Sequence, residues 1–537
     1  MKHFGRVVVG SSMGLVFTGL ASAGWPLDPA TNVAVVSRTA EQTLPKIAAT
    51  PDGGCYVGFH DLTSGSYDLF LQRYDRDGNA QWAAGGIAVS VQPQPSSLVD
   101  WALASASNGD CVLVFTDSRA GSDRDVYAYR VSPSGAQLWG ANGITLSVND
   151  DSEAAPRLAE LDDDSFVFVW PILPTGGSGR IVAQRITPSG SVLFPSPLTI
   201  VSAPPESPAF CDVVSGGGTD FIVSWVRDTR AFASPRHLRA QKFDGSGAPL
   251  WGAAPLEIYN LLSLPIAYNP QLRSDGAGGA VIAWHRSSGS RFDSFVQHVF
   301  FNGALGMPAN GALVTTDLTR QHFDPTIAVD ESTGDINVFW DARDATQGQR
   351  GIRAQRMSSV GALLFGANGV EIEPVDTTVE GLPRAAIMPD GGAAVVYLQA
   401  TGSVTDVIRA VRLRPDGSRV WGPGSTLISS VTSDKSRLPI TVNGFGSIIA
   451  TWEDDRALNR DIYAQALHAG GALGVLGDLN CDGIVSVGDI AAFVLALTDA
   501  PNYPASYPAC DIRLADVNGD GSVSVGDIAG FVGLLVG

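Results

Sequence analysis

Two twelve-residue segments near the C-terminus carry oxygen-bearing side chains at matching positions. Residues 478–489 read DLNCDGIVSVGD, and residues 516–527 read DVNGDGSVSVGD. Side-chain oxygens at positions 1, 3, 5, 9 and 12, with a glycine at position 6 for the sharp turn, are the pattern of a calcium-binding loop. Calcium is a hard cation that takes about six to eight oxygen ligands. The pattern therefore predicts two bound calcium ions.

The expected ligands of each loop combine five side chains with one backbone carbonyl. In loop one they are Asp478, Asn480, Asp482, Ser486 and Asp489, with the carbonyl of Ile484. In loop two they are Asp516, Asn518, Asp520, Ser524 and Asp527, with the carbonyl of Ser522. Position 12 is aspartate where the usual EF-hand has glutamate, so it binds through one oxygen or draws the following helix closer. The alternative is a pair of turn-rich surface loops without metal.

Apolar residues at helical spacing follow each loop. Offsets of 0, 3, 4 and 7 predict two short helices, each with one apolar stripe. The stripes are Ile490, Phe493, Val494 and Leu497 after loop one, and Ile528, Phe531, Val532 and Leu535 after loop two. Cys481 and Cys510 lie in the same segment, and we expect them to form a disulfide if the chain is secreted; two buried thiols are the alternative. The other cysteines, Cys55, Cys111 and Cys211, are expected to be free and buried.

Two loop-plus-helix units with aspartate at position 12 resemble a type I dockerin, over residues 477–537. The resemblance implies attachment of a secreted protein, often a polysaccharide-degrading enzyme, to a cohesin-like partner. In that family, loop positions 10 and 11 help to choose the partner; here they are Val487-Gly488 and Val525-Gly526. Their identity in the two halves implies two equivalent binding orientations. A calcium-stabilised domain that docks to nothing, or to the rest of its own chain, stays open as an alternative.

A repeat of about 56 residues fills the chain before this module. Each of eight copies has an apolar strand that ends in a Gln-Arg pair or a degenerate form of it. The anchor residues are Gln72, Tyr129, Gln184, Gln241, Gln297, Gln355, Val411 and Gln465. In copy two, turn residues separate strands expected at 101–105, 111–116, 126–131 and 144–148. Repeats of four short strands predict the blades of a β-propeller.

A second repeated feature supports eight blades. In seven copies a glycine precedes a large apolar residue by four positions, and this side chain is expected to fill the wedge between blades. The pairs are Gly78/Trp82, Gly135/Trp139, Gly190/Phe194, Gly247/Trp251, Gly303/Met307, Gly361/Phe365 and Gly417/Trp421. Copy eight lacks its large residue and fourth strand, and residues 25–37 offer both, as Trp25 and a strand over 33–37. We therefore predict that 25–37 completes blade eight and closes the ring.

The Gly-x-x-x-Trp spacing resembles the tryptophan-docking repeat of eight-bladed quinoprotein dehydrogenases and their non-enzymatic relatives. The adjacent cysteine pair that many of those enzymes have is absent here, and no two cysteines are neighbours in the sequence. The spacing also differs from the Asp-box of sialidases, in which the glycine precedes the aromatic residue by three positions. A quinone-dependent dehydrogenase is therefore the least supported function.

The N-terminus has the pattern of a secretory signal peptide. Lys2 and Arg6 precede an apolar stretch over 7–20, and Ala21-Ser22-Ala23 is a small-x-small cleavage pattern. The predicted organisation is therefore a signal peptide at 1–23, a propeller at 24–474 and the calcium module at 475–537. No segment is long and apolar enough to predict a membrane span. A net charge of −19 argues against binding to nucleic acid or an anionic membrane through bulk charge.

The propeller sequence offers few residues for catalysis. Asp and Arg recur after the second strand of several copies, as Asp117/Arg119, Asp228/Arg230, Asp341/Arg343 and Asp455/Arg456. A repeated pair favours a structural ion pair or turn cap. Glu153, Glu160 and Glu453 are candidate acids or bases without an evident partner. Six scattered histidines follow Met1–Ala23 and show no zinc-helix spacing. The catalytic residues are not predicted.

The sequence therefore predicts a mainly β, secreted, calcium-binding protein. Its eight-bladed propeller of four-stranded blades is expected to be a non-catalytic binding or display domain for a glycan or protein ligand. Its small α-helical, dockerin-like module is expected to attach it to a cohesin-like partner or an extracellular assembly. The alternative is a polysaccharide-degrading enzyme, a glycoside hydrolase acting on O-glycosyl bonds or a lyase, docked in a cellulosome-like complex.

Overall fold

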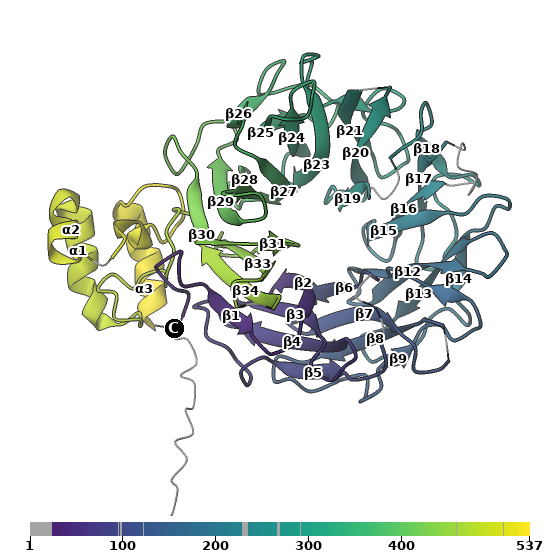
Figure 1. Ribbon diagram of the computed structural model, residues 1–537, viewed down its shortest axis with the longest axis horizontal. Helices are drawn as coiled ribbons and strands as arrows, with labels where there is room; N and C mark the ends of the chain where they lie inside the picture. Colours follow the sequence, from purple (N-terminus) through teal and green to yellow (C-terminus); the bar gives the residue numbers. More distant parts are fainter. Residues whose placement is uncertain are drawn as a thin grey trace, which may run out of the picture.

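The computed structural model describes residues 24–94, 96, 99–121, 123–227, 235–265, 269–289, 291–457, 459–508 and 510–536. The signal peptide predicted at 1–23 and the Asp228/Arg230 pair lie outside these residues. Within the described ranges, eight antiparallel sheets surround a common axis, and three short α-helices lie at the rim of the ring (Figure 1). The chain is therefore mainly β, with the predicted eight-bladed propeller.

The first four blades each run from an inner to an outer strand. Blade one has β2 (Gln42–Ala49), β3 (Cys55–Asp61), β4 (Asp68–Tyr74) and β5 (Ile87–Ser90). Blade two has β6 (Ala102–Ser105), β7 (Cys111–Asp117), β8 (Asp125–Val131) and β9 (Ile144–Thr145). Blade three has β10 (Ser152–Glu153), β11 (Arg157–Glu160), β12 (Phe166–Leu173), β13 (Arg180–Ile186) and β14 (Leu198–Val201). Blade four has β15 (Ala209–Ser215), β16 (Phe221–Arg227), β17 (His237–Phe243) and β18 (Leu256–Tyr259).

The next four blades continue around the ring. Blade five has β19 (Gln271–Ser274), β20 (Ala280–Ser288), β21 (Arg291–Val299) and β22 (Ala312–Leu313). Blade six has β23 (Gln321–Asp330), β24 (Asp335–Arg343), β25 (Arg350–Met357) and β26 (Val370–Asp376). Blade seven has β27 (Glu380–Ile387), β28 (Ala393–Ala400), β29 (Asp406–Leu413) and β30 (Thr426–Ser433). Blade eight has β31 (Lys435–Ser436), β32 (Ile440–Val442), β33 (Ile448–Asp454), β34 (Asp461–Leu467) and β1 (Val33–Val36).

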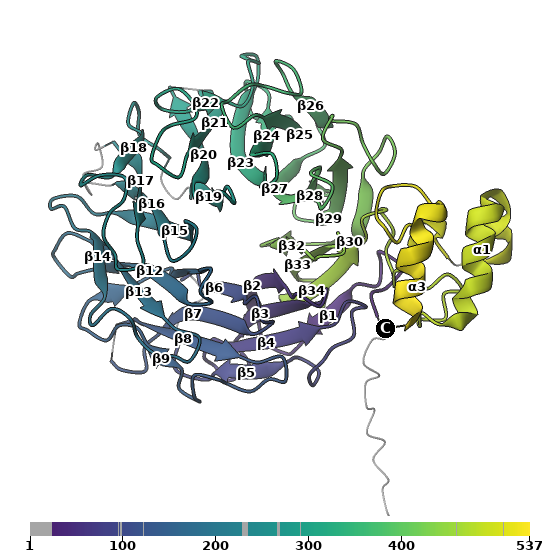
Figure 2. The ribbon, with the colours of Figure 1, turned by 180° about the vertical axis from the view of Figure 1, so that it is seen from behind.

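The helices belong to the C-terminal segment. The α-helices are α1 (Ile490–Thr498), α2 (Tyr503–Ser506) and α3 (Ile528–Val536). The 3₁₀ turns are η1 (Val487–Asp489), η2 (Ala500–Asn502), η3 (Ile512–Ala515) and η4 (Val525–Asp527). The two predicted exit helices are thus α1 and α3, and each begins directly after its loop. Figure 2 shows them outside the ring, beside blade eight.

The N-terminal strand closes the ring, as predicted. β1 is the outer strand of blade eight and pairs antiparallel with β34, with Val33 opposite Ala464. Trp25 is buried, and its indole N–H donates to the carbonyl of Arg76 in blade one, at 3.0 Å. The first and last strands of the propeller therefore belong to one blade. Their pairing covers an edge of β34 that would otherwise be exposed.

The repeated large side chains dock between neighbouring blades. Trp82, Trp139, Trp251 and Trp421 each donate from the indole N–H to a backbone carbonyl of the next blade, as Trp25 does. The accepting residue lies two positions before the repeated glycine. The glycine leaves room for the docked ring, because a methyl group added at Gly303 would come within 2.9 Å of the Trp251 ring. Blade three departs from this pattern, because the side chain nearest Gly247 is Leu198 and not Phe194.

The apolar core is divided among the blade junctions. The described residues form eight buried apolar clusters, each built from two adjacent blades, and a ninth cluster in the C-terminal segment. Second strands are therefore buried on both faces, and every residue of β7 and β33 is buried. This packing leaves the inner strands and the loops at the two ends of the ring for polar chemistry.

Candidate functional site

The two predicted calcium loops have the same hydrogen-bond geometry. In loop one, Oδ2 of Asp478 accepts the backbone N–H of Gly483 at 2.9 Å, and in loop two Oδ2 of Asp516 accepts that of Gly521 at 2.9 Å. Nδ2 of Asn480 lies 3.0 Å from Asp482, and Nδ2 of Asn518 lies 3.0 Å from Asp520. Both segments are therefore folded into the same turn around the same set of oxygens.

The aspartate at position 12 binds each loop to its own backbone. Asp489 is fully buried; its Oδ1 accepts the N–H groups of Leu479 and Asn480, and its Oδ2 accepts that of Ser486 at 2.8 Å. Asp527 repeats this arrangement with Asn518 and Ser524. The short carboxylate thus joins the start and the end of the loop, and it brings the following helix close.

One oxygen of loop two has no partner in the protein. Asp516 is buried, and its Oδ1 accepts no hydrogen bond. A buried carboxylate oxygen without a partner is costly unless a cation or water meets it. Together with the all-oxygen donor set, this orphaned atom fits a hard cation such as calcium. Coordination of calcium by either loop stays a prediction.

A disulfide ties loop one to the segment before loop two. Cys481 and Cys510 are bonded, with a Cα–Cα distance of 5.7 Å, as predicted. Cys55, Cys111 and Cys211 are free and buried, also as predicted. Phe493 of α1 and Phe531 of α3 stack at 4.0 Å, so the two halves share one small core.

The apolar stripes of α1 and α3 are divided between the core and the surface. Phe493 and Phe531 are buried, but Ile490 and Val494 are 43% and 49% exposed, and Ile528 and Val532 are 44% and 50% exposed. At loop position 10, Val487 and Val525 are each 78% exposed. Each half therefore presents a Val-Ile-Val patch: patch one is Val487, Ile490 and Val494, and patch two is Val525, Ile528 and Val532.

The C-terminal module is packed on the propeller through loop two. Arg412 of β29 is buried, and its Nη1 donates to the carbonyls of Ala469 and Gly519, at 2.7 and 2.8 Å. Its Nη2 bonds Asp390 at 2.7 Å. A methyl group on Gly519 would lie 2.6 Å from Ala469, so the backbones approach closely. Loop two thus rests on blades seven and eight.

Several charged side chains on the inner strands, or just beside them, line cavities near the axis of the propeller. Lys46 and Arg157 both bond Asp100, at 2.6 and 2.8 Å. Arg384 and Arg437 line a cavity of about 240 Å³ together with Lys46 and Asp100. Asp100 and Arg157 also line a larger cavity of about 650 Å³, with Asp212 and the apolar Phe210 and Leu173. The two spaces therefore meet at Asp100.

Asp100 and Asp212 have opposite pKa shifts. Burial raises the pKa of Asp100, but Lys46 and Arg157 outweigh it and bring this pKa to about 2. Burial raises the pKa of Asp212, and the nearby Arg157 only partly opposes this shift. An ionised carboxylate and a more readily protonated one thus line the same cavity as Arg157. Two carboxyl groups with different pKa values are what acid–base hydrolysis requires.

The repeated Asp/Arg pairs are structural, with one correction. Arg119 bonds Asp117 and Arg343 bonds Asp341, each within one blade. In blade eight the predicted pair Asp455/Arg456 is wrong, because Arg456 bonds Asp454, one residue before Asp455. Asp454 is the last residue of β33 and is fully buried, so its carboxylate points into the blade, where Arg456 and Lys435 meet it.

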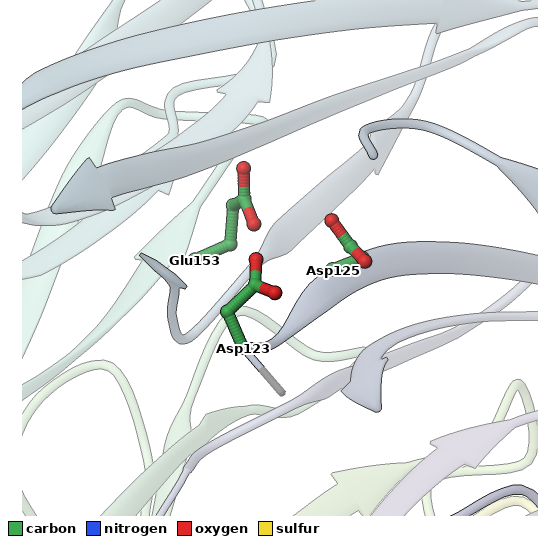
Figure 3. Close-up of side chains that lie close together, drawn as sticks. All are labelled: Asp123, Asp125 and Glu153. Atoms are coloured by element: carbon green, nitrogen blue, oxygen red, sulfur yellow. The ribbon is translucent and has the colours of Figure 1, made fainter. Parts of the chain in front are cut away.

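The three glutamates singled out as acids or bases have different surroundings. Both oxygens of Glu160 accept the N–H of Ser107, and Glu453 joins blade eight to Thr43 and Leu44 of blade one. These two have structural roles. Glu153 is buried beside Asp123 and Asp125 (Figure 3), and its pKa is raised to about 7, mainly by burial.

Sequence reasoning missed the residues of the propeller axis. Asp100, Arg157 and Asp212 come from three blades and have no shared motif. The signal in the sequence was only a charged side chain near the start of several inner strands. In the structure, such a side chain lies two residues after a position with positive φ, such as Leu44, Ala155 or Phe210.

No helix of the described residues is long and apolar enough to cross a membrane.

No family of known proteins and no curated protein matches the chain at the sequence level. Among solved structures, an ulvan lyase of polysaccharide lyase family PL25, bound to a GlcA–Rha3S oligosaccharide, is 10% identical with a TM-score of 0.43; the alignment covers 82% of this chain and 96% of that one. A protein of unknown function from Dyadobacter fermentans is 10% identical, TM-score 0.35, over 81% and 98% of the two chains. A GH93 α-L-arabinofuranosidase of Fusarium graminearum with arabinobiose is 8% identical, TM-score 0.35, over 59% and 93%. Similarity at this level assigns no function to the chain.

Proposed function

We propose that the chain is a secreted calcium-binding protein whose C-terminal module attaches the propeller to a partner protein. The observation that carries the proposal is the duplication of one surface: each loop, with its helix, presents the same half-exposed Val-Ile-Val patch beside the same set of oxygens. Apolar side chains exposed at identical positions of two repeated units are unusual unless a partner covers them.

Calcium would hold each patch in shape. The proposed ligands of the two ions are the twelve residues named from the sequence, and the orphaned Oδ1 of Asp516 supports an ion in loop two. Because α1 and α3 each begin directly after a loop, an ion in the loop fixes the start of the helix. The partner expected from the dockerin resemblance is cohesin-like, and it would bind either patch through the same contacts.

The test uses the whole secreted chain and a panel of type I cohesin domains, in calcium and in chelator. We expect calcium-dependent binding that survives Val487→Asp or Val525→Asp alone within about twofold. The double variant should lose binding, because neither patch remains. Val404→Asp, on a propeller loop where Val404 is 69% exposed, is the matched control. Binding that resists the chelator or the double variant, or no binding to any cohesin, would contradict the attachment role.

A second candidate function is polysaccharide processing at the propeller axis, and it is favoured by the opposite pKa shifts of Asp100 and Asp212. Asp212 would act as the acid and Asp100 as the ionised carboxylate, with Arg157 between them. The charged lining suits a glycan with acidic groups, because Arg384 in the smaller cavity donates to a backbone carbonyl and forms no ion pair with a carboxylate among the described residues.

Release of reducing ends or unsaturated products from uronate-containing glycans tests this candidate. Asp212→Asn should abolish turnover without loss of the fold, because the carboxylate of Asp212 makes no ion pair among the described residues. Asp416→Asn, at an outer turn, is the control. Full activity in Asp212→Asn, or no turnover of any acidic or neutral plant or algal glycan by the parent chain, would leave the propeller as a binding domain.

A further inference from the structure

Three carboxyl groups meet at the junction of blades two and three. Asp123 precedes β8, Asp125 is its first residue, and Glu153 is the last residue of β10. One carboxylate oxygen from each lies within 4.8 Å of the others, and Figure 3 shows the three groups around one small space. Two oxygens bound to one calcium ion at about 2.4 Å lie at most about 4.8 Å apart. The spacing is therefore that of ligands around a single ion.

The cluster is buried and lacks a positive charge. Glu153 is 0% exposed and Asp125 is 1% exposed, and Asp123 is half-buried. Oε1 of Glu153 accepts hydrogen bonds from Ser147 and Asn149, at 2.7 and 2.6 Å. Oε2 of Glu153 and Oδ2 of Asp123 are buried and accept none.

The same turn of blade two contains an ion pair, but this cluster does not. Arg119 bonds Asp117, whereas no ion pair in the described part of the chain includes Asp123, Asp125 or Glu153. Three carboxylates buried together repel one another unless a cation or a proton neutralises them. Two buried oxygens without a hydrogen-bond partner, in a group of three carboxyls this close, suit the binding of a cation.

The junction of blades eight and one has a neutral residue, Gln42, at the position equivalent to Glu153. There the backbone N–H of Gln42 donates to the carbonyl of Arg460, just as that of Glu153 donates to the carbonyl of Arg124. Asp461 follows Arg460 as Asp125 follows Arg124, and its Oδ2 accepts the hydroxyl of Ser37. Gln42 is a buried neutral amide. The fold therefore accepts glutamine at this position, and the carboxylate of Glu153 is not needed to build the junction.

We propose that Asp123, Asp125 and Glu153 bind a hard divalent cation, with calcium the expected ion, between blades two and three. The donor set is all oxygen, without histidine or cysteine, which favours calcium, magnesium or manganese over zinc. Arg124 and Ala154, the sequence neighbours of the three ligands, line the cavity of about 650 Å³ at the propeller axis. The half-buried Asp123 gives the ion a route from solvent. This site is independent of the C-terminal loops.

The test counts ions on the full chain after dialysis against calcium, by elemental analysis. Asp478→Asn with Asp516→Asn removes the two C-terminal sites, and this background variant should keep one ion per chain. Adding Glu153→Gln should remove that ion, while Glu160→Gln on the next strand of the same blade should not. An unchanged ion count in Glu153→Gln, or no ion in the background variant with calcium, magnesium or manganese, would overturn the site.

Thermal unfolding gives a second readout that does not depend on counting. Without divalent ions, Glu153→Gln should melt at or above the temperature of the background variant, because it removes a buried negative charge. With calcium, the melting temperature of the background variant should rise and that of Glu153→Gln should stay constant. A Glu153→Gln chain that melts lower in chelator, or that gains as much from calcium as its parent, would contradict the proposal. Loss of cohesin binding is read from the C-terminal patches, so the two proposals fail separately.

Discussion

The amide Nε2 of Gln465, at the end of the propeller, donates a hydrogen bond of 2.6 Å to the backbone carbonyl of Pro26. Gln72, Gln241, Gln297 and Gln355 make the same bond to the residue that follows the large docking side chain of their own blade. In blade eight the docking side chain is Trp25, so the repeated glutamine reaches across the chain ends. The ring is closed by the same contacts that build each blade.

The first prediction concerns this closure. Trp25→Ala should lower the free energy of unfolding by about 3–5 kcal/mol, because it empties a buried site and removes the bond to Arg76. Trp251→Ala, at an equivalent site within the continuous chain, is the control and should cost a similar amount. Hydrogen exchange at Val33–Val36 should accelerate in Trp25→Ala alone. Equal protection of that strand in both variants would show that Trp25 does not hold it.

The second prediction concerns the contact between module and propeller. Arg412→Lys should weaken calcium binding to loop two about tenfold, because one ammonium group cannot reproduce the bonds of the guanidinium to Ala469, Gly519 and Asp390. Calorimetry in the Asp478→Asn, Glu153→Gln background measures loop two, and the Asp516→Asn, Glu153→Gln background measures loop one, which should be unaffected. Arg130→Lys, the corresponding change in blade two, is the control. A change of the same size in both loops would argue against the contact.

The third prediction concerns pH and Glu380. Burial raises the pKa of this carboxyl from 4.5 to about 7 in the folded chain. The folded state therefore holds an extra proton between these values, so its stability falls as the pH rises from about 4.5 to 7, and the loss is complete above pH 7. Glu380→Gln does not titrate and should gain up to about 3 kcal/mol over the parent at pH 8, but little at pH 4. Urea unfolding at both pH values measures this. A gain independent of pH would contradict the shift, and Glu160→Gln is the control.

The fourth prediction concerns the disulfide. Cys481→Ser with Cys510→Ser removes a link across 29 residues, which destabilises the module by roughly 3 kcal/mol in the chain-entropy account. Trypsin cleavage after Arg513, followed by mass spectrometry, should then accelerate by up to about a hundredfold in chelator. Cleavage within the propeller should not change. Calcium should restore part of the protection by mass action, and equal cleavage with and without the disulfide would show that it does not stabilise the module.

Much of this protein is determined by local pattern. The period of about 56 residues and the glycine four positions before each large side chain predicted eight blades. The final copy lacks its fourth strand, which predicted that 25–37 completes the last blade. The two oxygen-rich loops and the helices that follow them were predictable for the same reason, since the expected ligands of each loop lie within twelve residues. Where a loop or blade is built from one continuous segment, the spacing of residues in the sequence determines their spacing in the fold.

Tertiary structure decided what sequence spacing does not encode. Glu153 meets Asp123 and Asp125 only because blade three packs on blade two, and Asp100 and Asp212 face the same cavity only because inner strands converge on the axis. Ile490 and Val494 lie outside the core, which is filled by the stacked Phe493 and Phe531 together with other buried side chains such as Tyr503. Arg456 pairs with Asp454 because Asp454 is the last, fully buried residue of β33, whereas Asp455 lies beyond the strand and accepts the backbone N–H of Asp434. Helical and strand periods determine which side chains share a face, and packing between elements determines what each face meets.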